Sequence, residues 1–372
     1  MSVSFVDHFS ALSDPRQQWK VVHPLPEVLL LVLCGHLAGA EDFVEIAEWG
    51  SEKLDFLRKL LPYKQGIASH DTLNNVFNAL DHTVFSALFS SWVMSLTQDM
   101  PALVAIDGKT SRRSHKRDGK ALHMVSAFAT QARMVLGQQA CAEKSNEITA
   151  IPLLLEKLQL TGALVSIDAM GCQTKIAQTI VDAGADYLLA LKDNQRSLAR
   201  EVELYFAGNP HNSADFESVD AGHGRIETRR VAVSHDVGWL HGTKQAAGEP
   251  RFPALAAIAK VDRVVEHKAK STVSRQTSYY ITSASLNAEQ LANAIRGHWM
   301  IENGLHWVLD VVFHDDLCRL RTGHGPQNMA LIRHAAANML QANTAKGSMK
   351  VKRKRAAWSD DFIKQLLAQP SA

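Results

Sequence analysis

Cysteine is scarce in this sequence. Only Cys34, Cys141, Cys172 and Cys318 occur among 372 residues, and no two of them form a Cys-x-x-Cys pair. Structural zinc sites and disulfide frameworks both need closely spaced cysteines, so we expect neither. The pattern favours a reduced, cytoplasmic setting.

Long apolar runs are also missing. The most apolar stretch, Val28 to Leu33, is far shorter than the ~20 residues that a membrane-spanning helix needs. The first eight residues contain no basic segment followed by an apolar one, which is the pattern of a signal peptide. We therefore expect no membrane role.

The chain has almost no net charge, but its charges are unevenly placed. Forty Lys and Arg against 38 Asp and Glu give a formal charge of +2. Residues 1–100 hold 6 basic and 12 acidic residues, which leaves 34 basic and 26 acidic residues in the remainder. Between Leu317 and Trp358, nine basic residues occur without a single acid. Such a run either contacts nucleic acid or forms a solvated tail, and charge alone does not separate the two.

Residues 1–98 are predicted to form a helical domain. Gly39 is expected to close its first helix, and Ser69 is expected to cap its third. Helices joined by short turns suit either a helix-turn-helix DNA reader or a plain helical bundle. The expected helices are Pro24–Leu37, Glu41–Leu61 and Thr72–Leu80.

Residues 99–206 alternate between β-rich and helical patterns. Three strands with short connections, then alternating helices and strands, match a mixed α/β sheet with the strand order of an RNase H-like core. The expected strands are Leu103–Ile106, His123–Ala129, Val135–Ala140, Ala163–Ile167 and Asp186–Lys192, and the expected helices are Glu147–Leu158 and Cys172–Ala183.

The rest of the chain divides into three stretches. Residues 207–287 are turn-rich and β-like, which predicts a β-rich subdomain inserted into the core. Residues 288–345 are expected to complete the core. Residues 346–372 are expected to form a basic tail, with Lys350–Arg355 in a polar stretch before a short final helix.

Three acidic residues are candidates for chemistry. Asp107 and Asp168 each follow a short apolar, β-branched run, which predicts a carboxylate at the end of a buried strand. Glu302 lies in the segment Ala294–Asp310, where His298, Glu302, His306 and Asp310 recur every four residues and would share one helix face. Such a set of hard oxygen ligands suits two Mg²⁺ ions and phosphoryl transfer. Taken singly, each aspartate fits an ordinary turn residue, and the combination of all three acids is what favours a site.

The two histidines beside Glu302 leave a second interpretation open. His298, Glu302 and His306 could bind zinc from one helix face, although the His-Glu-x-x-His arrangement is absent. A zinc hydrolase would also leave Asp107 and Asp168 without a role. Trp299 and Trp307 are expected in the core or as wedges, and stacking on an extruded base is a further hypothesis.

The motifs along the chain resemble those of the ISAs-family insertion-sequence transposases, which include the H-repeat-associated proteins. The resemblance covers nearly the whole chain in order. It rests on Asp14-Pro-Arg-Gln, Ser69-His-Asp-Thr-Leu, Ala105-Ile-Asp-Gly-Lys, His123-Met-Val-Ser-Ala-Phe, Glu143-Lys-Ser-Asn-Glu-Ile-Thr-Ala-Ile-Pro, Ile167-Asp-Ala-Met-Gly-Cys-Gln, Tyr187-Leu-Leu-Ala-Leu-Lys, Gly222-His-Gly-Arg and His298-Trp-Met-Ile-Glu-Asn-Gly-Leu-His-Trp.

This resemblance implies a DNA transposase in which Asp107, Asp168 and Glu302 are the DDE catalytic triad and the metal ligands. It also implies an RNase H-like fold, two Mg²⁺ ions with Mn²⁺ as a substitute, double-stranded DNA as partner, and a homodimer on DNA associated with the bacterial nucleoid. The alternatives are a domesticated, catalytically silent DNA-binding protein and a simple RNase H-like nuclease.

One signature of the wider superfamily is not matched. Many relatives carry Tyr-Arg-Glu-Lys around the glutamate, with Arg four residues before it and Lys seven after. Here those positions are His298 and Leu309, so the roles of that Arg and Lys do not carry over, and Arg296 and His306 are only conjectural substitutes. The residues expected to contact DNA are Lys109, Arg112, Arg113, Lys116, Lys192, Arg225, Arg296, His298, Trp299, His306, Lys352, Arg353, Lys354 and Arg355.

Overall fold

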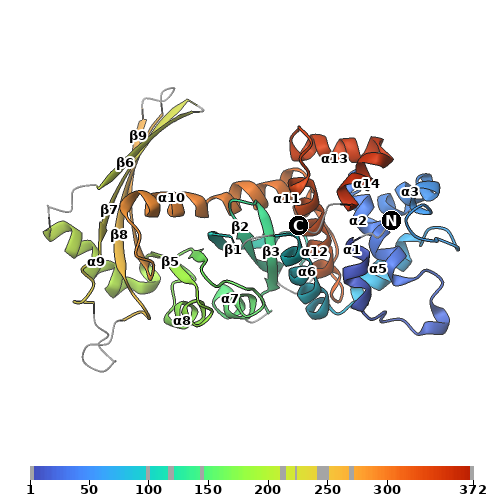
Figure 1. The fold of residues 1–372 in the computed structure, drawn as a ribbon, viewed down its shortest axis with the longest axis horizontal. Helices are drawn as coiled ribbons and strands as arrows, with labels where there is room; N and C mark the ends of the chain where they lie inside the picture. The colour runs from blue at the N-terminus through green and yellow to red at the C-terminus, as the bar shows by residue number, and fades with distance from the viewer. Residues whose placement is uncertain are drawn as a thin grey trace. The chain divides into compact units, whose positions relative to one another are not determined.

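The computed structural model divides the chain into two compact units, each assembled from separate stretches of sequence. Unit 1 contains Met1–Asp99, Gly108–Asn146 and Ile301–Ala372, and unit 2 contains Met100–Asp107 and Glu147–Met300 (Figure 1). The structure describes residues 4–97, 101–115, 121–142, 146–209, 215–222, 224–240, 251–267 and 272–368.

The N-terminal helices begin and end where local signals predict. Pro24 precedes α2 (Leu25–Ala38), and Gly39 ends it in the left-handed conformation with φ of 105°. The Ser69 side chain caps α5 (His70–Ala79), as predicted. The single helix expected over 41–61 is wrong, because it breaks at Lys53 into α3 (Phe43–Glu52) and α4 (Leu54–Leu57). The other helices of this region are α1 (Ser4–His8) and α6 (His82–Leu96).

In unit 1, the N-terminal helices share a core with the C-terminal part of the chain. The long helix α12 (Gly325–Ala342) packs against α2, α5 and α6, and α13 (Met349–Trp358) packs against α2. The helix α14 (Asp360–Leu367) completes this group. The apolar side chains of α5 point into this core, so α5 belongs to a helical bundle.

The strands of unit 1 are β2 (Leu122–Ala129), β3 (Met134–Ala140) and the last residues of β1 (Leu103–Ser111), which begins in unit 2. β2 and β3 pair antiparallel. Two short 3-10 turns, Phe9–Ala11 and Gln18–Lys20, lie near the N-terminus.

The strands follow the order β3-β2-β1-β4-β5-β9-β8-β7-β6. β4 (Leu164–Ile167) and β5 (Asp186–Leu191) run parallel to β1. The helix α7 (Glu147–Leu155) precedes β4, and α8 (Thr174–Asp182) connects β4 to β5. The first five strands have the order of an RNase H-like core, so the predicted α/β fold class is confirmed.

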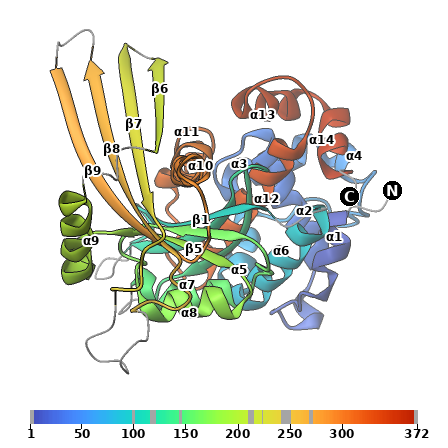
Figure 2. The same cartoon turned by 60° about the vertical axis from the view of Figure 1, so that its left-hand side comes forward.

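The β-rich region continues the same sheet beyond β5. Its four strands are β6 (Phe216–Gly222), β7 (Arg225–Ser234), β8 (Ala257–His267) and β9 (Thr272–Thr282), all antiparallel to their neighbours. The helices α9 (Arg196–Gly208) and α10 (Ala288–His298) cover opposite faces of these strands (Figure 2). The β9–β5 pairing is what joins the region to the core of unit 2.

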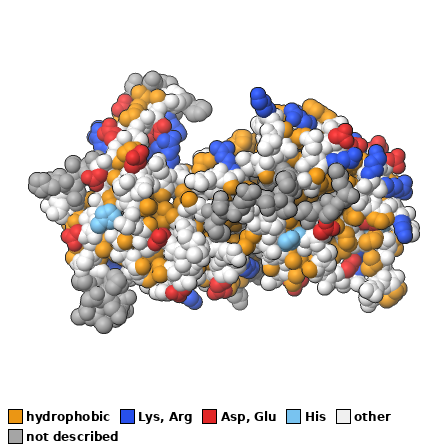
Figure 3. Space-filling model, in the orientation of Figure 1, with side chains coloured by type: hydrophobic (Ala, Val, Ile, Leu, Met, Phe, Trp, Pro, Cys, Tyr) orange, Lys and Arg blue, Asp and Glu red, His pale blue; other side chains and the backbone are white. Residues whose placement is uncertain are grey.

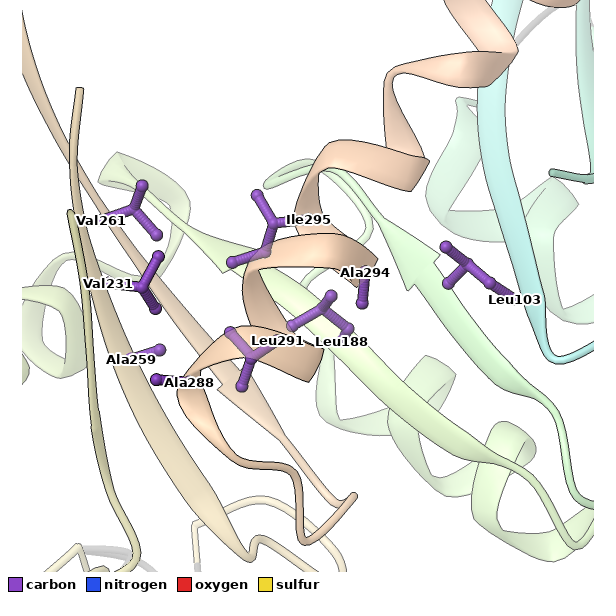
Figure 4. Packing of buried hydrophobic residues seen from close by; sticks show 9 residues of the cluster. All are labelled: Leu103, Leu188, Val231, Ala259, Val261, Ala288, Leu291, Ala294 and Ile295. Atoms are coloured by element: carbon purple, nitrogen blue, oxygen red, sulfur yellow. The ribbon is translucent and has the colours of Figure 1, made fainter. Parts of the chain in front are cut away.

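One hydrophobic core cluster of unit 2 lies where α10 meets the sheet. Leu291 and Ile295 of α10 point toward Val231 and Val261 of β7 and β8, and Leu188 of β5 packs beside them (Figure 4). Leu291 is fully buried, so replacing it with alanine would cost about 2–5 kcal/mol of stability. This packing fixes the helix that leads to His298 and, along the chain, to Glu302.

No helix among the described residues is long and apolar enough to cross a bilayer.

Candidate active site

Asp107 and Asp168 follow paired residues on two adjacent parallel strands of unit 2. Ile106 of β1 pairs with Ile167 of β4, and each aspartate comes directly after its member of this pair. Because neighbouring strands lie ~4.8 Å apart, the two positions are side by side. β1 continues through Ser111, so Asp107 lies inside its strand, whereas only Asp168 lies at a strand end as the sequence predicted.

The Asp168 side chain holds the turn that follows β4. Its Oδ1 accepts hydrogen bonds from the backbone N–H groups of Met170 at 2.9 Å and Gly171 at 3.3 Å. A Cβ atom at residue 171 would lie 2.3 Å from the Ile167 side chain, so only glycine fits this tight turn. The turn role and a ligand role are compatible, because a carboxylate has about four lone-pair sites.

His298 ends α10 and is turned toward β4. Its Nδ1 lies 3.1 Å from the Ser166 hydroxyl, and the residue is partly buried. Burial lowers the pKa of His298, and the Asp168 carboxylate only partly offsets this, so the imidazole is neutral near pH 7. The prediction that His298 contacts DNA does not fit this position, which makes it an internal partner of β4 beside Asp168.

Glu302 begins a π-helical turn in unit 1. The turn Glu302–His306 leads directly into α11 (Trp307–Val311), and the Glu302 side chain is exposed. A Cβ atom at Gly304 would lie 3.2 Å from the Phe128 ring, so glycine lets the turn lie against β2. Such π-turns within helices are rare and frequently occur at functional sites.

The expected continuous helix with His298, Glu302, His306 and Asp310 on one face is wrong. Regular α-helix stops at His298, and the π-turn changes the period beyond it. His298 contacts Ser166, whereas His306 lines a small cavity in unit 1 together with His334. The zinc interpretation required the uninterrupted helix, so the structure gives it no support. His306 is also partly buried, which disfavours its predicted contact with DNA.

Lys109 is not available as a DNA contact, contrary to the sequence prediction. Its side chain is only 11% exposed, and its Nζ lies 2.7 Å from Asp310, 3.2 Å from Asp315 and 3.4 Å from Asp316. Burial opposes the charge, but these three carboxylates outweigh burial and raise the pKa of Lys109. The Asp315–Asp316 pair in the sequence was the signal for this cluster, and sequence reasoning missed it.

The remaining predicted DNA contacts of unit 1 near β1 are exposed. Arg112 has an 82% exposed side chain, with its Nε 3.3 Å from Asp316, and the Arg113 carbonyl accepts a hydrogen bond from Arg321. Lys116 lies outside the described residues. Arg112 and Arg113 therefore stay candidates.

The predicted basic tail is wrong at two positions. Lys350–Arg355 belongs to the helix α13, in which Lys352 and Arg353 are buried. Lys352 donates to the carbonyls of residues 340 and 343, and Arg353 donates to those of residues 36, 40 and 312. Burial lowers the pKa of Arg353 to about 10. Both side chains satisfy backbone acceptors in the bundle, so neither reaches DNA.

Lys354 and Arg355 are the outward-facing pair of this predicted set. Lys354 is exposed, and Arg355 is partly exposed with its guanidinium 5.2 Å from the Phe362 ring centre. Trp299 and Trp307, expected in the core or as wedges, are each 56% exposed. Exposed aromatic rings can stack on unpaired bases, and the stacking hypothesis remains a prediction for both.

In unit 2, the predicted contacts Arg225 and Arg296 belong to a cluster of arginines and acids. Glu227 is buried and accepts from Arg229 and Arg263, each at 2.5 Å, with Arg225 at 3.9 Å. Arg296 pairs with Asp220 at 2.5 Å. Basic and acidic side chains occur together on the strands β6, β7 and β8 (Figure 3). Lys192, directly after β5, is exposed.

Two family models match this chain. A transposase DDE domain matches residues 98–339, and a domain described as DDE_Tnp_1-associated matches residues 6–93. The chain therefore belongs to the DDE transposase family, and the resemblance drawn from its motifs is confirmed.

Relatives of nearly full length carry transposase names. The chain is 39% identical to "Putative transposase YncI" of Escherichia coli O157:H7, covering 99% of this chain and 95% of that protein. It is 36% identical to "H repeat-associated putative transposase YhhI" of Escherichia coli strain K12, covering 98% and 97%. A solved piggyBac transposase synaptic complex with hairpin DNA matches with a TM-score of 0.42 at 10% identity, covering 96% of this chain and 77% of that chain.

Proposed function

We propose that this protein cleaves and joins DNA strands at the ends of an insertion sequence, with Asp107, Asp168 and Glu302 as the metal-binding triad. The observation that carries the proposal is the register of β1 and β4, which sets two carboxylates side by side in a chain of the DDE transposase family. Ligands of α/β sheets collect at the carboxyl ends of strands, and Asp168 lies at such an end.

The donor set fits divalent metal ions of the magnesium type. All three side chains offer carboxylate oxygens, the hard ligands that Mg²⁺ prefers. Two bound Mg²⁺ ions would stabilise the charge that develops on the attacking and leaving oxygens of the phosphodiester, and Mn²⁺ would substitute for them.

The chain's own residues prepare this site in two ways. The backbone N–H groups of Met170 and Gly171 hold Asp168 in one orientation, so little ordering is needed when it binds a ligand. The neutral His298 adds no positive charge that would repel a cation beside Asp168. Double-stranded DNA is the substrate in this proposal. The proposal includes a homodimer on DNA, because two element ends must be joined.

The test is cleavage of linear DNA that carries the element's ends, with each cut strand mapped in Mg²⁺. Asp107→Asn, Asp168→Asn and Glu302→Gln should each abolish cleavage and leave DNA binding within about threefold, because only the metal-dependent step loses a ligand. Asp55→Asn is the matched control, since the Asp55 side chain is 99% exposed in unit 1.

Wild-type protein that binds the ends but never cuts them would favour the domesticated, silent DNA-binding protein. Cleavage without any joining, and without preference for end DNA, would favour the simple nuclease. Full cleavage by one of the three variants would remove that residue from the site.

A further inference from the structure

Lys109 lies at the centre of a cluster of three aspartates, and such a cluster has the composition of a cation site. One oxygen from each of Asp310, Asp315 and Asp316 lies within 4.8 Å of the others. The Lys109 Nζ lies between 2.7 and 3.4 Å from all three carboxylates. An ammonium group therefore already occupies the position among these three acids that a metal ion would take.

Arg333 of α12 holds the buried end of this cluster in place. It is almost completely buried, and its Nη1 donates to Asp315 Oδ1 at 2.6 Å, while Lys109 contacts Asp315 through Oδ2. Asp315 is itself buried, and two cations hold its two oxygens. The three aspartates, Lys109 and Arg333 are called the lysine socket below.

The acids of the lysine socket come from the segment that follows Glu302. Asp310 lies in α11, which continues directly from the π-turn Glu302–His306, and Asp315 and Asp316 begin the next short helix, Asp315–Leu317. Between them, His314 has a φ of 51°, a left-handed conformation that costs a non-glycine residue about 1 kcal/mol. The contacts on both sides hold this strained residue in place.

Lys109 connects this segment to the strand that carries Asp107. Lys109 lies two residues after Asp107 on β1, so their side chains are at alternate positions on the same side of the strand. The lysine socket therefore ties the segment that follows Glu302 to residues 108–111 of β1, which belong with that segment to unit 1.

We propose that Lys109 is a positioning residue that fixes the Glu302 segment against β1, and that Asp310, Asp315 and Asp316 hold its ammonium and not a metal ion. The inference rests on the proposed function for the role of Glu302. The arrangement itself can be tested without catalysis.

The first experiment compares hydrogen–deuterium exchange of residues 302–311 in full-length variants. Lys109→Met should raise exchange there by at least about tenfold, because the segment loses its tie to β1. Lys53→Met is the matched control, since it removes a Lys–Asp pair of 2.9 Å elsewhere in unit 1 and should leave this segment unchanged. Unchanged exchange in Lys109→Met would overturn the inference.

A second variant separates positioning from folding. Lys109→Met with Asp310→Asn and Asp316→Asn removes the uncompensated acids but keeps the Arg333–Asp315 pair, and it should recover the wild-type unfolding midpoint. Cleavage of end DNA should still be about 10–100-fold slower than wild type, as is usual when a residue supporting a metal ligand is lost, and higher Mg²⁺ should partly restore it. Recovery of both stability and rate would mean that Lys109 only supports folding.

Two further results decide against the inference. Loss of DNA affinity in Lys109→Met, with a flatter salt dependence, would make Lys109 a DNA contact. Loss of a bound Mn²⁺ in Asp310→Asn or Asp316→Asn, in protein without DNA, would make the acids a metal site. Wild-type protein inactive in Mg²⁺ would count against the proposed function alone, and the exchange experiment would then decide the inference.

Discussion

The lysine socket and the arginine cluster around Glu227 are charge clusters of opposite balance. In the lysine socket, three acids surround one lysine and a buried arginine. Around Glu227, three arginines surround one buried acid, with Arg296 and Asp220 at the margin. The first cluster has fewer cations than acids. The second has more arginines than acids, and those arginine side chains are partly exposed.

This difference separates two uses of charge. A cluster whose cations are buried and paired fixes backbone segments, because breaking it leaves a charge in a low-dielectric interior. An exposed cluster with surplus arginine can exchange its internal partners for phosphate, which guanidinium groups bind with two parallel hydrogen bonds. We therefore expect structural effects from the first cluster and DNA-binding effects from the second.

The largest effect is expected at Asp315. Asp315→Asn should lower the free energy of unfolding by about 3–5 kcal/mol, because Arg333 and Lys109 both lose a buried partner. Chemical denaturation measures this change. Asp55→Asn should change stability by less than about 0.5 kcal/mol, and a similarly small loss at Asp315 would remove the structural role of the lysine socket.

Lowering the pH should lower the free energy of unfolding through His334, a buried histidine in the region of the lysine socket. Burial lowers the pKa of His334 to about 3, and the ordinary value in the unfolded chain is about 6.5. The unfolded state therefore binds the proton more readily, and stability is lost as pH falls from 6.5 toward 3. At pH 5 the loss from this residue is about 2 kcal/mol.

His334→Leu removes this proton-binding group. Its free energy of unfolding should fall less between pH 7 and pH 5 than that of the wild type, by about 2 kcal/mol. Two parallel pH curves would show that His334 is protonated equally in both states.

Much of the fold could be predicted from the sequence, and the reason is local. The β-branched run before Asp168 and the helix after it were both located within about two residues, because strand and helix periods differ over short windows. Proline and glycine marked both ends of α2 in the same way.

The predictions that failed have a common physical cause. Each of these residues has a position that depends on contacts with residues far away in the sequence. Arg353 is buried because carbonyl groups more than 300 residues earlier in the chain accept its hydrogen bonds. The composition of the segment around Arg353 does not reveal these acceptors. Lys109 meets its acids about 200 residues later. The π-turn at Glu302 lies where Gly304 meets Phe128 of β2, whereas the four-residue spacing alone predicted a plain helix.

Removing the acid of the arginine cluster should cost less than removing Asp315. Glu227→Gln should lower the free energy of unfolding by about 1 kcal/mol, because water screens the partly exposed arginines that lose their partner. Glu217→Gln, at an exposed pair on the neighbouring strand, is the control and should change stability by less than about 0.5 kcal/mol. A loss at Glu227 as large as that at Asp315 would erase the distinction between the clusters.

The smallest effect is expected for a single arginine of the exposed cluster. Arg225→Gln should flatten the salt dependence of DNA binding by about 0.9 in the log–log slope if Arg225 contacts one phosphate. The loss should be equal on end DNA and unrelated DNA, because phosphate contacts carry no direct base information. Arg200→Gln on α9, with a side chain 63% exposed, is the control. An unchanged slope in Arg225→Gln would exclude the phosphate contact.

Metal dependence of strand cleavage tests the central claim most directly. With wild-type protein and end DNA, Mg²⁺ and Mn²⁺ should support cleavage, Ca²⁺ should support binding with little cleavage because it tolerates looser coordination geometry, and EDTA should stop the reaction. Cleavage that persists in EDTA, or that requires Zn²⁺, would contradict a metal-binding triad of Asp107, Asp168 and Glu302.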